Sequence, residues 1–165
     1  MLSYILAVVS AVLLLGADQL TKYLVSAGFT LGERREFLNG FIDLTYIHNR
    51  GGAWGLLYGK TYILIPITVI VMAVCIILYK EYGKKNKLLF WAIMLVLSGG
   101  IGNMIDRVCR DGKVIDFLQF EFFPSFPVFN VADCAIVVGA GLLILYFLID
   151  SVKESKRKSA EKTDE

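Results

Sequence analysis

Long stretches without charged side chains constrain this sequence most strongly. Four stretches are almost entirely apolar, and they cover residues 1–17, 61–79, 88–105 and about 126–149. The second has 19 positions and the third has 18 without a charge, while the fourth contains only Asp133. A helix that crosses a bilayer needs about 20 mostly apolar residues. The sequence therefore predicts a membrane α-helical protein with four transmembrane helices, over about residues 3–25, 61–79, 88–106 and 128–149.

Composition supports this prediction and excludes several classes of protein. Hydrophobic residues make up 56% of the 165 residues and charged residues 19%, whereas soluble domains average about 45–50% and about 25%. This apolar content excludes disorder over most of the chain. A net charge of +2 gives no sign of nucleic-acid binding. The first stretch lacks the basic start of a secretory signal peptide, so we expect it to remain as a membrane helix.

Basic residues indicate how the helices are oriented. The connection 80–87 and the tail 150–165 hold nine Lys and Arg in 24 residues, whereas the connections 26–60 and 106–125 hold seven in 55. Basic residues in short loops mark the cytoplasmic side. We therefore expect both termini in the cytoplasm and the two longer connections outside.

The predicted organisation is a single integral membrane domain over residues 1–150. Its outer connections would cover about 26–60 and 107–127. The charged tail, residues 151–165, lacks apolar periodicity, and we expect it to be disordered in the cytoplasm.

The outer connections carry signals for short strands. Asn39-Gly40 is a turn signal between apolar residues, and both Ile42 to His48 and Val114 to Phe122 alternate in part between polar and apolar. We expect a small extracytoplasmic β-sheet that rests on the four-helix bundle. Its aromatic residues would lie at lipid headgroup depth or pack under the sheet, and they are Phe117, Phe120, Phe122, Phe123 and Phe126.

The unusual polar residues all fall at the outer side of this predicted bundle. They are Asp18, Asn49, Asn103, Asp106, Arg107, Asp116, Asn130 and Asp133. Ionisable residues in membrane spans are costly, and they are usually functional or paired. The alternative for Asp18, Asp106 and Arg107 is that they mark the water boundary. Asp18 and Lys22 are four residues apart and would form an ion pair.

Small residues on the third and fourth helices predict close helix packing. Such residues let two helix backbones approach each other in a membrane. In this sequence they are Gly99, Gly100, Gly102, Ala135 and Gly139.

Several kinds of catalytic site find little support. His48 is the single histidine, so the sequence has no HExxH motif, and its three cysteines do not have zinc-site spacing. No GxSxG motif supports a Ser-His-Asp site. Lys22 and Ser26 have the spacing of a Ser–Lys pair, although a lysine after a span is usually an interfacial anchor. We expect neither a metal nor a cofactor.

Carboxylates are the remaining candidates for chemistry. Asp116 and Asp133 are 17 residues apart, and the turn from Phe122 to Pro127 would fold Asp116 back over the start of the fourth helix. Two carboxylates that share one proton can activate water, one as the base and the other as donor to a scissile carbonyl oxygen. The spacing is compatible with such a pair without establishing it.

Five motifs in order make the sequence resemble a known family. They are DQLTK (18–22), NRGGAWG (49–55), GGIGNMIDR (99–107), VIDF (114–117) and FNVAD (129–133). With these motifs the chain resembles the lipoprotein signal peptidase (signal peptidase II) family of bacterial aspartic membrane proteases, from about residue 14 to residue 149. Trp54 stands where the family usually shows Phe.

The resemblance implies a catalytic role for two of these residues and an orienting role for two others. Asp116 and Asp133 would be the catalytic pair. Asn103 and Asn130 would orient this pair or the peptide.

The resemblance implies binding or structural roles for the rest. Asn49 and Arg107 would contact the substrate backbone. Asp18 would hold the fold or engage the lipid-bearing end of the substrate. Lys22 and Asp106 would be structural or close to lipid.

The resemblance also implies the reaction and its setting. The substrate would be a prolipoprotein that already carries diacylglycerol on its lipobox cysteine, and the cut would fall just before that cysteine. The enzyme would be a multi-pass protein of the bacterial cytoplasmic (inner) membrane, with membrane lipids as its other partners. The basic residues separately predict that its termini are cytoplasmic and its active site lies at the outer face, and nothing in the sequence demands more than a monomer.

Two rival functions stay open from the sequence. A small proton-coupled transporter would use the interfacial carboxylates as a proton relay, although such sites tend to lie near the midplane at broken helices. A non-catalytic membrane subunit would use the polar cluster only for helix packing.

Overall fold

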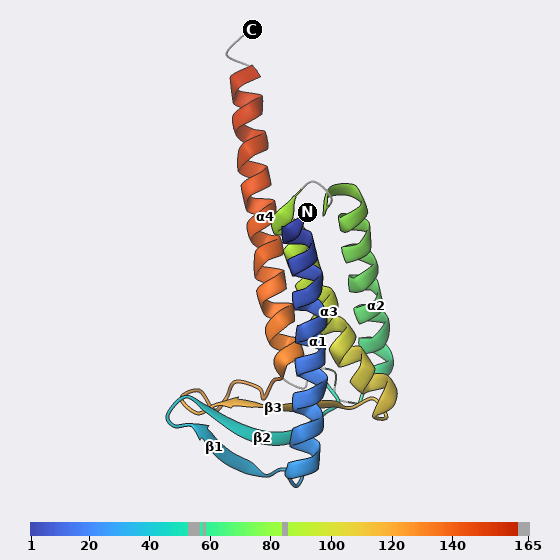
Figure 1. Ribbon diagram of the computed structural model, residues 1–165, viewed down its shortest axis with the longest axis vertical. Helices are drawn as coiled ribbons and strands as arrows, with labels where there is room; N and C mark the ends of the chain where they lie inside the picture. The colour runs from blue at the N-terminus through green and yellow to red at the C-terminus, as the bar shows by residue number, and fades with distance from the viewer. Residues whose placement is uncertain (53–56, 58, 84–85, 162–165) are drawn as a thin grey trace.

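Four long helices dominate the computed structural model, which describes residues 1–52, 57, 59–83 and 86–161. The helices run side by side (Figure 1), and they are α1 (Leu2–Gly28), α2 (Thr61–Leu78), α3 (Lys87–Cys109) and α4 (Val131–Glu161). A π-helical turn, η2 (Tyr79–Gly83), follows α2. Each of the four helices is long and apolar enough to cross a membrane. This confirms the prediction of a four-span membrane α-helical protein.

A three-stranded antiparallel sheet lies across one end of the bundle, which we call the sheet end (Figure 1). Its strands in order are β1 (Arg34–Leu38), β2 (Ile42–Asn49) and β3 (Val114–Phe120). The predicted turn at Asn39-Gly40 joins β1 to β2, and Gly40 has a φ of +74°, which glycine adopts at no steric cost. The predicted small sheet is therefore confirmed.

The inner face of the sheet packs on the bundle. A buried cluster joins Val25 of α1 to Tyr46, Ile115 and Phe117 of the sheet. Phe117 is 4% exposed and belongs to the core, as the packing alternative predicted, whereas Phe122 and Phe123 are 61% and 50% exposed, and their depth in a membrane stays a prediction. The buried Phe117 holds β3 against the ends of the helices, and β3 also carries the candidate carboxylate Asp116.

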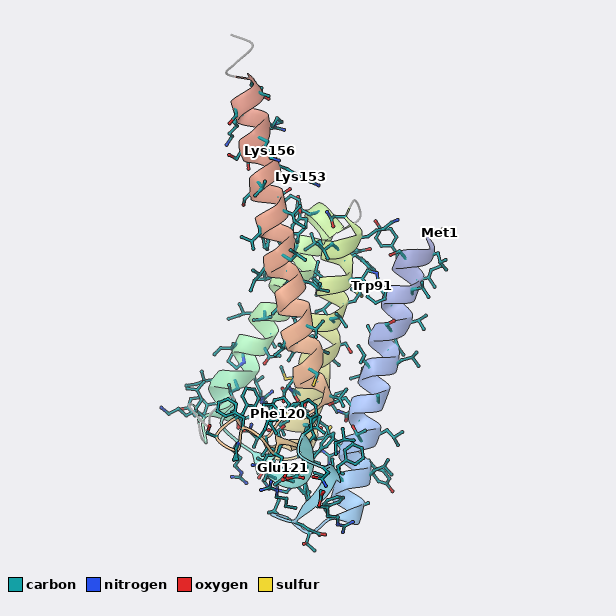
Figure 2. All side chains as sticks on the ribbon, turned by 90° about the vertical axis from the view of Figure 1, so that its left-hand side faces the viewer. Met1, Trp91, Phe120, Glu121, Lys153 and Lys156 are labelled. Carbon is teal, nitrogen blue, oxygen red and sulfur yellow. The ribbon has the colours of Figure 1, made fainter. Side chains whose placement is uncertain are left out.

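Both ends of the described chain lie away from the sheet (Figure 1). Figure 2 shows Met1 and Trp91 at that end of the bundle, where Trp91 Nε1 donates to Ser3 Oγ over 3.2 Å. Phe120 and Glu121 lie at the opposite, sheet end (Figure 2). An even number of spans requires this arrangement of the termini.

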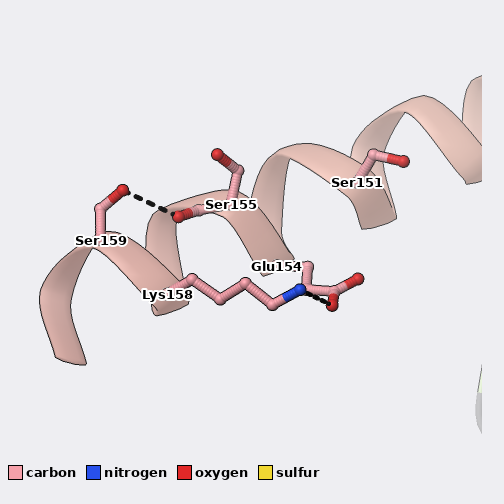
Figure 3. A pocket seen from close by; sticks show the side chains of 5 residues that line it. All are labelled: Ser151, Glu154, Ser155, Lys158 and Ser159. Carbon is pink, nitrogen blue, oxygen red and sulfur yellow. Dashed lines mark hydrogen bonds and ion pairs between the residues drawn. The ribbon is translucent and has the colours of Figure 1, made fainter. Parts of the chain in front are cut away.

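Helix α4 is longer than the sequence analysis predicted. It continues to Glu161 and projects beyond the other helices (Figures 1 and 2), so the structure corrects the expected disorder over residues 151–161. Extension of an existing helix avoids the cost of nucleation, and Lys, Glu and Arg are good helix formers. Lys158 Nζ lies 2.7 Å from Glu154 Oε1, four residues away on the helix surface (Figure 3), and such pairs stabilise exposed helices.

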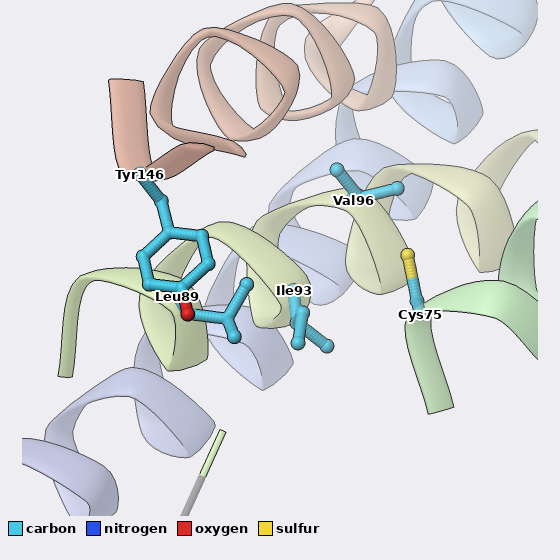
Figure 4. Close-up of a cluster of buried hydrophobic side chains, with 5 residues drawn as sticks. All are labelled: Cys75, Leu89, Ile93, Val96 and Tyr146. Carbon is cyan, nitrogen blue, oxygen red and sulfur yellow. The ribbon is translucent and has the colours of Figure 1, made fainter. Parts of the chain in front are cut away.

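Helix α3 lies at the centre of the bundle. On the half away from the sheet, Leu89, Ile93 and Val96 of α3 pack with Cys75 of α2 and Tyr146 of α4 in a hydrophobic cluster (Figure 4).

Glycines bring α3 and α4 close together, as predicted. A Cβ atom at Gly99 would lie 2.2 Å from the carbonyl oxygen of Ala132, and one at Gly139 would lie 2.9 Å from the carbonyl oxygen of Ala92. Gly100 differs, because its nearest neighbour would be the Met72 side chain at 3.7 Å. The contact at Gly99 sets the distance between the two helices beside the polar residues.

Candidate active site

The structure brings Asp116 and Asp133 to one place, although they belong to different elements. Asp116 lies on β3 and is 1% exposed, and Asp133 lies in the first turn of α4. Asn130 joins them, because its Nδ2 donates to Asp116 Oδ1 over 2.6 Å and its backbone N–H donates to Asp133 Oδ2 over 3.1 Å. We call these two carboxylates the dyad.

Backbone pairing explains how 17 residues of chain return to the same point. After the turn that contains Phe126, Phe129 forms an isolated antiparallel bridge with Leu118 of β3. The Phe129 N–H donates to the Leu118 carbonyl over 2.9 Å, and the Leu118 N–H donates to the Phe129 carbonyl over 2.8 Å. The next residue, Asn130, is therefore beside Asp116, which confirms the predicted fold-back.

The start of α4 then fixes Asp133. The Asp133 N–H donates to Asn130 Oδ1 over 3.0 Å, and Asp133 Oδ2 accepts the Asn130 N–H in return. This reciprocal arrangement is a capping box, which satisfies two backbone donors at a helix start. The spacing of Asn130 and Asp133 was a signal for it that the sequence analysis missed.

Amide groups surround the dyad, and each carboxylate oxygen accepts one N–H. Asn49 Nδ2 donates to Asp116 Oδ2 over 2.8 Å, and Asn103 Nδ2 donates to Asp133 Oδ1 over 2.7 Å. The other two oxygens accept from Asn130. The structure therefore brings Asn49, Asn103 and Asn130 to the dyad, as their motifs suggested.

Burial changes the acidity of Asp116. Loss of hydration first, and then the negative charge of Asp133, raise the pKa of Asp116 from 3.8 to about 7, although hydrogen bonds from Asn49 and Asn130 lower it. A carboxyl group with this pKa exchanges its proton near neutral pH, which is the condition for general acid–base catalysis. Like charges that share a site cannot both ionise easily, so ionisation of the second carboxyl of the dyad is disfavoured.

A second pair of carboxylates lies beside the dyad and binds a lysine. Lys22 is 0% exposed, and its Nζ lies 2.9 Å from Asp18 Oδ2 and 3.1 Å from Asp106 Oδ2. The predicted Asp18–Lys22 ion pair is confirmed, but Asp106 is a second partner. Lys22 is therefore not an exposed interfacial anchor, and it does not pair with Ser26, whose hydroxyl donates to the Tyr23 carbonyl.

This second pair holds the elements of the site together. Asp18 Oδ1 accepts the N–H of Ala132 at the start of α4 over 2.9 Å, and Asp106 Oδ2 accepts the N–H of Ile115 in β3 over 3.0 Å. Asp18 and Asp106 are thus buried connections between elements, and the water-boundary alternative is wrong for both.

One further polar residue of the first motif joins this cluster. Gln19 Nε2 donates to Asp18 Oδ2 over 3.0 Å and to the Gly102 carbonyl over 3.2 Å. The sequence analysis included Gln19 in its motif without assigning it a role.

A cavity of about 510 Å³ opens beside the dyad. Its polar end contains Asn49, Asn103, Arg107 and the dyad, and its apolar side is formed by aromatic and aliphatic side chains that include Phe120, Phe126, Ile136, Val137 and Val138. Arg107 donates through Nη1 to the Asn103 carbonyl over 3.3 Å. Its buried Nε has no hydrogen-bond partner among the described residues, so a donor is left for a ligand in the cavity.

Two further expectations concern the second motif, around Trp54, and a metal site. Trp54, together with Ala53 and Gly55 of the second motif, lies outside the described residues. Within the described part of the chain, no three His, Cys, Asp or Glu side chains are grouped as for a metal ion.

Sequence comparisons identify relatives of the chain. The sequence pattern of the family described as Signal peptidase (SPase) II matches residues 10–149. A lipoprotein signal peptidase of Enterococcus faecalis is 46% identical over 146 residues, which cover 87% of this chain and 89% of that protein. One of Bacillus pumilus is 40% identical over 154 residues, which cover 93% and 96%.

Solved structures give the same result for the fold. A structure described as that of a bacterial membrane enzyme superposes with a TM-score of 0.82 at 34% identity and covers 88% of each chain. A second with the same description has a TM-score of 0.78 at 34% identity. These descriptions give no support to the transporter alternative.

Proposed function

The chain belongs to the lipoprotein signal peptidase (signal peptidase II) family, and from this membership we propose that it removes the signal peptide of bacterial prolipoproteins. The bond that is cut lies just before the lipobox cysteine, and that cysteine already carries diacylglycerol. Members of this family are aspartic peptidases, so the reaction is hydrolysis of a peptide bond by water.

The observation that carries the proposal is the dyad in its cavity. Asp116 and Asp133 line the same cavity and share Asn130 as a hydrogen-bond donor. In the proposed mechanism they bind one water molecule between them. The ionised carboxylate removes a proton from this water as it attacks the carbonyl carbon, and the protonated carboxyl donates its proton to the carbonyl oxygen. The carboxyl that took the water proton then donates it to the nitrogen of the cysteine as the C–N bond breaks, and the other carboxylate takes back a proton from a hydroxyl of the tetrahedral intermediate. The signal peptide leaves with a new carboxyl group, and the dyad again holds one proton.

The proton balance of this mechanism fits the chemistry of the dyad. One carboxyl has to be protonated and the other ionised before water attacks. The raised pKa of Asp116, about 7, supports Asp116 as the group that retains the proton. Asn103 and Asn130 hold the carboxyl planes in a fixed orientation through hydrogen bonds of 2.7 and 2.6 Å, so little reorganisation is needed when water attacks.

The polar end of the cavity is suited to a peptide backbone. In the proposal, the unpartnered Nε of Arg107 donates to a substrate carbonyl. Asn49 contacts the substrate backbone beside it. An extended peptide exposes unpaired N–H and C=O groups, and these must find partners when water is excluded.

The apolar side of the cavity is suited to the lipid of the substrate. From Asp133 the lining continues along α4 through Ile136, Val137 and Val138, of which Val137 is 70% exposed. A helix rises 1.5 Å per residue, so these side chains follow α4 from the dyad into the membrane-spanning part of the bundle. We propose that an acyl chain on the cysteine lies along this surface.

The proposed setting follows from the basic residues and the sheet. The sheet end, with the dyad, faces the outside of the bacterial cytoplasmic membrane, and the termini with the α4 extension are in the cytoplasm. The enzyme acts as a monomer, and residues 1–150 form a single membrane domain. A lipid-anchored substrate in the outer leaflet then reaches the cavity without leaving the membrane, and water reaches it from outside.

A cleavage assay tests this function. Purified protein in lipid vesicles is given one prolipoprotein peptide in two forms, with and without diacylglycerol on its cysteine. We expect cleavage before the cysteine of the lipidated form, much slower cleavage of the other form, and loss of cleavage in Asp116→Asn. Equal cleavage of the two forms would contradict the proposed substrate.

Asp43→Asn is a matched control for this assay. Asp43 is also a buried aspartate of the sheet, at 4% exposure, but it pairs with Arg34 and does not line the cavity. We expect this variant to cleave at close to the wild-type rate. If Asp116→Asn retains activity while it is folded, the dyad is wrong.

A further inference from the structure

Lys22, like Asp106, is a fully buried charge of the site, and it hydrogen-bonds to Asn103 of the cavity lining. Its three ammonium protons have three acceptors within 3.1 Å, which are Asp18 Oδ2, Asp106 Oδ2 and Asn103 Oδ1. An ammonium group has three donors, so this geometry uses all of them. The contact with Asn103 is a hydrogen bond to a neutral side chain, which the ion pairs with Asp18 and Asp106 do not require.

The contact with Asn103 determines which way its amide group faces. Asn103 Oδ1 accepts from Lys22 Nζ and from Asn130 Nδ2, each over 3.1 Å. Its Nδ2 then points to Asp133 and donates to Oδ1 over 2.7 Å. A flipped amide would bring its NH2 group against two donors and leave Asp133 facing an oxygen. Lys22 therefore enforces the orientation that supplies a hydrogen bond to the dyad.

The charge of Lys22 also contributes to the net charge around the dyad. Each element packed against the dyad supplies charged groups. They are Asp18 and Lys22 of α1, Asp106, Arg107 and Arg110 at the end of α3, Asp116 of β3 and Asp133 of α4. At the end of β2, His48 and Arg50 contact Tyr46 and Asp111 instead. With one proton on the dyad, these charges sum to zero.

We propose that Lys22 is a positioning residue for peptide cleavage: through Asn103 it holds Asp133 in its reactive orientation, and its charge keeps the dyad in the state that holds one proton. The proposal rests on the proposed function, because it assigns Lys22 a part in that reaction. It goes beyond a structural role, which would end at the ion pairs with Asp18 and Asp106.

Lys22→Met tests the proposal, because methionine keeps an unbranched side chain as far as the ε position and removes the charge and the donors of the ammonium group. We expect kcat to fall about 100-fold, the order seen when reacting groups are misplaced by about 1 Å, while KM changes little because Lys22 does not contact substrate. The loss of a positive charge disfavours ionisation of Asp116. We therefore expect the alkaline limb of the pH–activity profile to move up by about 0.5 to 1 pH unit.

Arg34→Met is the matched control. It also replaces the cation that pairs with a buried aspartate, here Asp43, but it does not contact the dyad. This variant should lose stability without a change in the alkaline limb. If Lys22→Met behaves in the same way, with normal kcat per folded molecule and an unmoved alkaline limb, Lys22 is only structural and the proposal is overturned.

A charge-neutral double variant addresses a failure of Lys22→Met to fold. Asp18→Asn together with Lys22→Met removes one negative and one positive charge, so no excess charge stays buried. We expect this variant to have the wild-type alkaline limb while kcat stays low, because Asn103 still lacks its donor. Wild-type kcat in the double variant would overturn the positioning role.

Infrared titration of the Asp116 carboxyl band separates this proposal from the proposed function. The band reports protonation without any substrate, and Asp116→Asn identifies it. If the wild type does not cleave the lipidated peptide but Lys22→Met still moves the titration to higher pH, the proposed function fails and the coupling of Lys22 to the dyad stands. A titration that Lys22→Met leaves unchanged overturns that coupling.

Discussion

Two pairs of aspartates lie side by side in one layer of the bundle, and they are stabilised in different ways. Asp18 and Asp106 bind a lysine between them, at 2.9 and 3.1 Å from its Nζ. Asp116 and Asp133 have neutral amide donors on all four oxygens. Loss of hydration and a neighbouring like charge favour the protonated form of a carboxyl group, and Asp116 meets both conditions. The same side chain thus binds a cation in one pair and accepts neutral amide donors in the other, where we propose that it carries the chemistry.

The same substitution in each pair gives the largest expected contrast. Asp133→Asn should lower cleavage by about 10³-fold or more, the order of a lost acid–base group, and should change the unfolding temperature by only about 3 °C. The variant keeps an oxygen acceptor and removes a charge from a partly buried site.

Asp18→Asn should have the opposite profile. It breaks a buried ion pair and weakens the acceptor for the Ala132 N–H, at a cost of about 3 kcal/mol in the free energy of unfolding. Thermal unfolding in detergent and cleavage at low temperature measure the two effects separately. Equal stability losses in Asp18→Asn and Asp133→Asn would contradict the distinction between the pairs.

The distance between the two pairs of aspartates depends on the contact of α3 with α4. A substitution at this contact should have the next largest effect. Gly99→Ala places a Cβ 2.2 Å from the Ala132 carbonyl oxygen, and we expect a loss of about 1–3 kcal/mol together with slower cleavage. Gly100→Ala is the control on the next residue, where the nearest atom would be 3.7 Å away. Thermal unfolding of both variants measures this difference, and equal losses would contradict the role given to the helix contact.

Asp116 of the dyad should make the stability of the protein depend on pH near neutrality. The folded-state pKa of Asp116, about 7, is above its ordinary value of 3.8, so the folded protein holds this proton more tightly than the unfolded chain. Its contribution to stability is therefore fully present below about pH 4 and is lost as the pH rises through about 7.

Asp116→Asn should flatten this dependence. The measurement is the unfolding temperature between pH 4 and pH 8, with Asp43→Asn as the control that keeps the wild-type slope. If Asp116→Asn shows the same decline as the wild type, another group causes it and the assignment to the dyad is wrong.

The smallest effect is expected at an ion pair outside the bundle. Lys158 and Glu154 are 2.7 Å apart on the α4 extension, but their side chains are 64% and 54% exposed (Figure 3). Water and salt screen such pairs, so Lys158→Met should cost about 0.5 kcal/mol or less and should leave cleavage unchanged. Helix content by circular dichroism and the cleavage assay check this. A large loss would mean that exposure is a poor guide to the strength of these ion pairs.

Much of the fold could be predicted from local properties of the sequence. The four helices follow from apolar stretches of membrane-crossing length, and the β1–β2 turn follows from Asn39-Gly40. The α4 extension could not be predicted in this way, because its residues have no apolar periodicity. They are helical because they continue a helix that already exists and have high helix propensity.

The sequence predicted which residues form the candidate site, but it did not predict which of them contact one another. Spacing placed Asn130 and Asp133 on one face, and the motifs selected Asp116, Asn49 and Asn103. The sequence could not indicate that Lys22 contacts Asn103, which is 81 residues away. The alternative that Lys22 is an interfacial anchor was reasonable for a lysine after an apolar stretch, but Asp106 and Asn103 bind its ammonium group instead, together with the predicted partner Asp18.

The sequence by itself determined that this chain crosses a membrane four times and gathers its carboxylates at one end of the helices. That result needs only hydropathy and the thickness of a bilayer, which act on each stretch of chain separately. The tertiary structure decided which carboxylates are held by neutral amide donors and which bind a cation. In a buried site this choice depends on contacts of about 3 Å between helices and sheet, and these contacts exist only after the elements have packed.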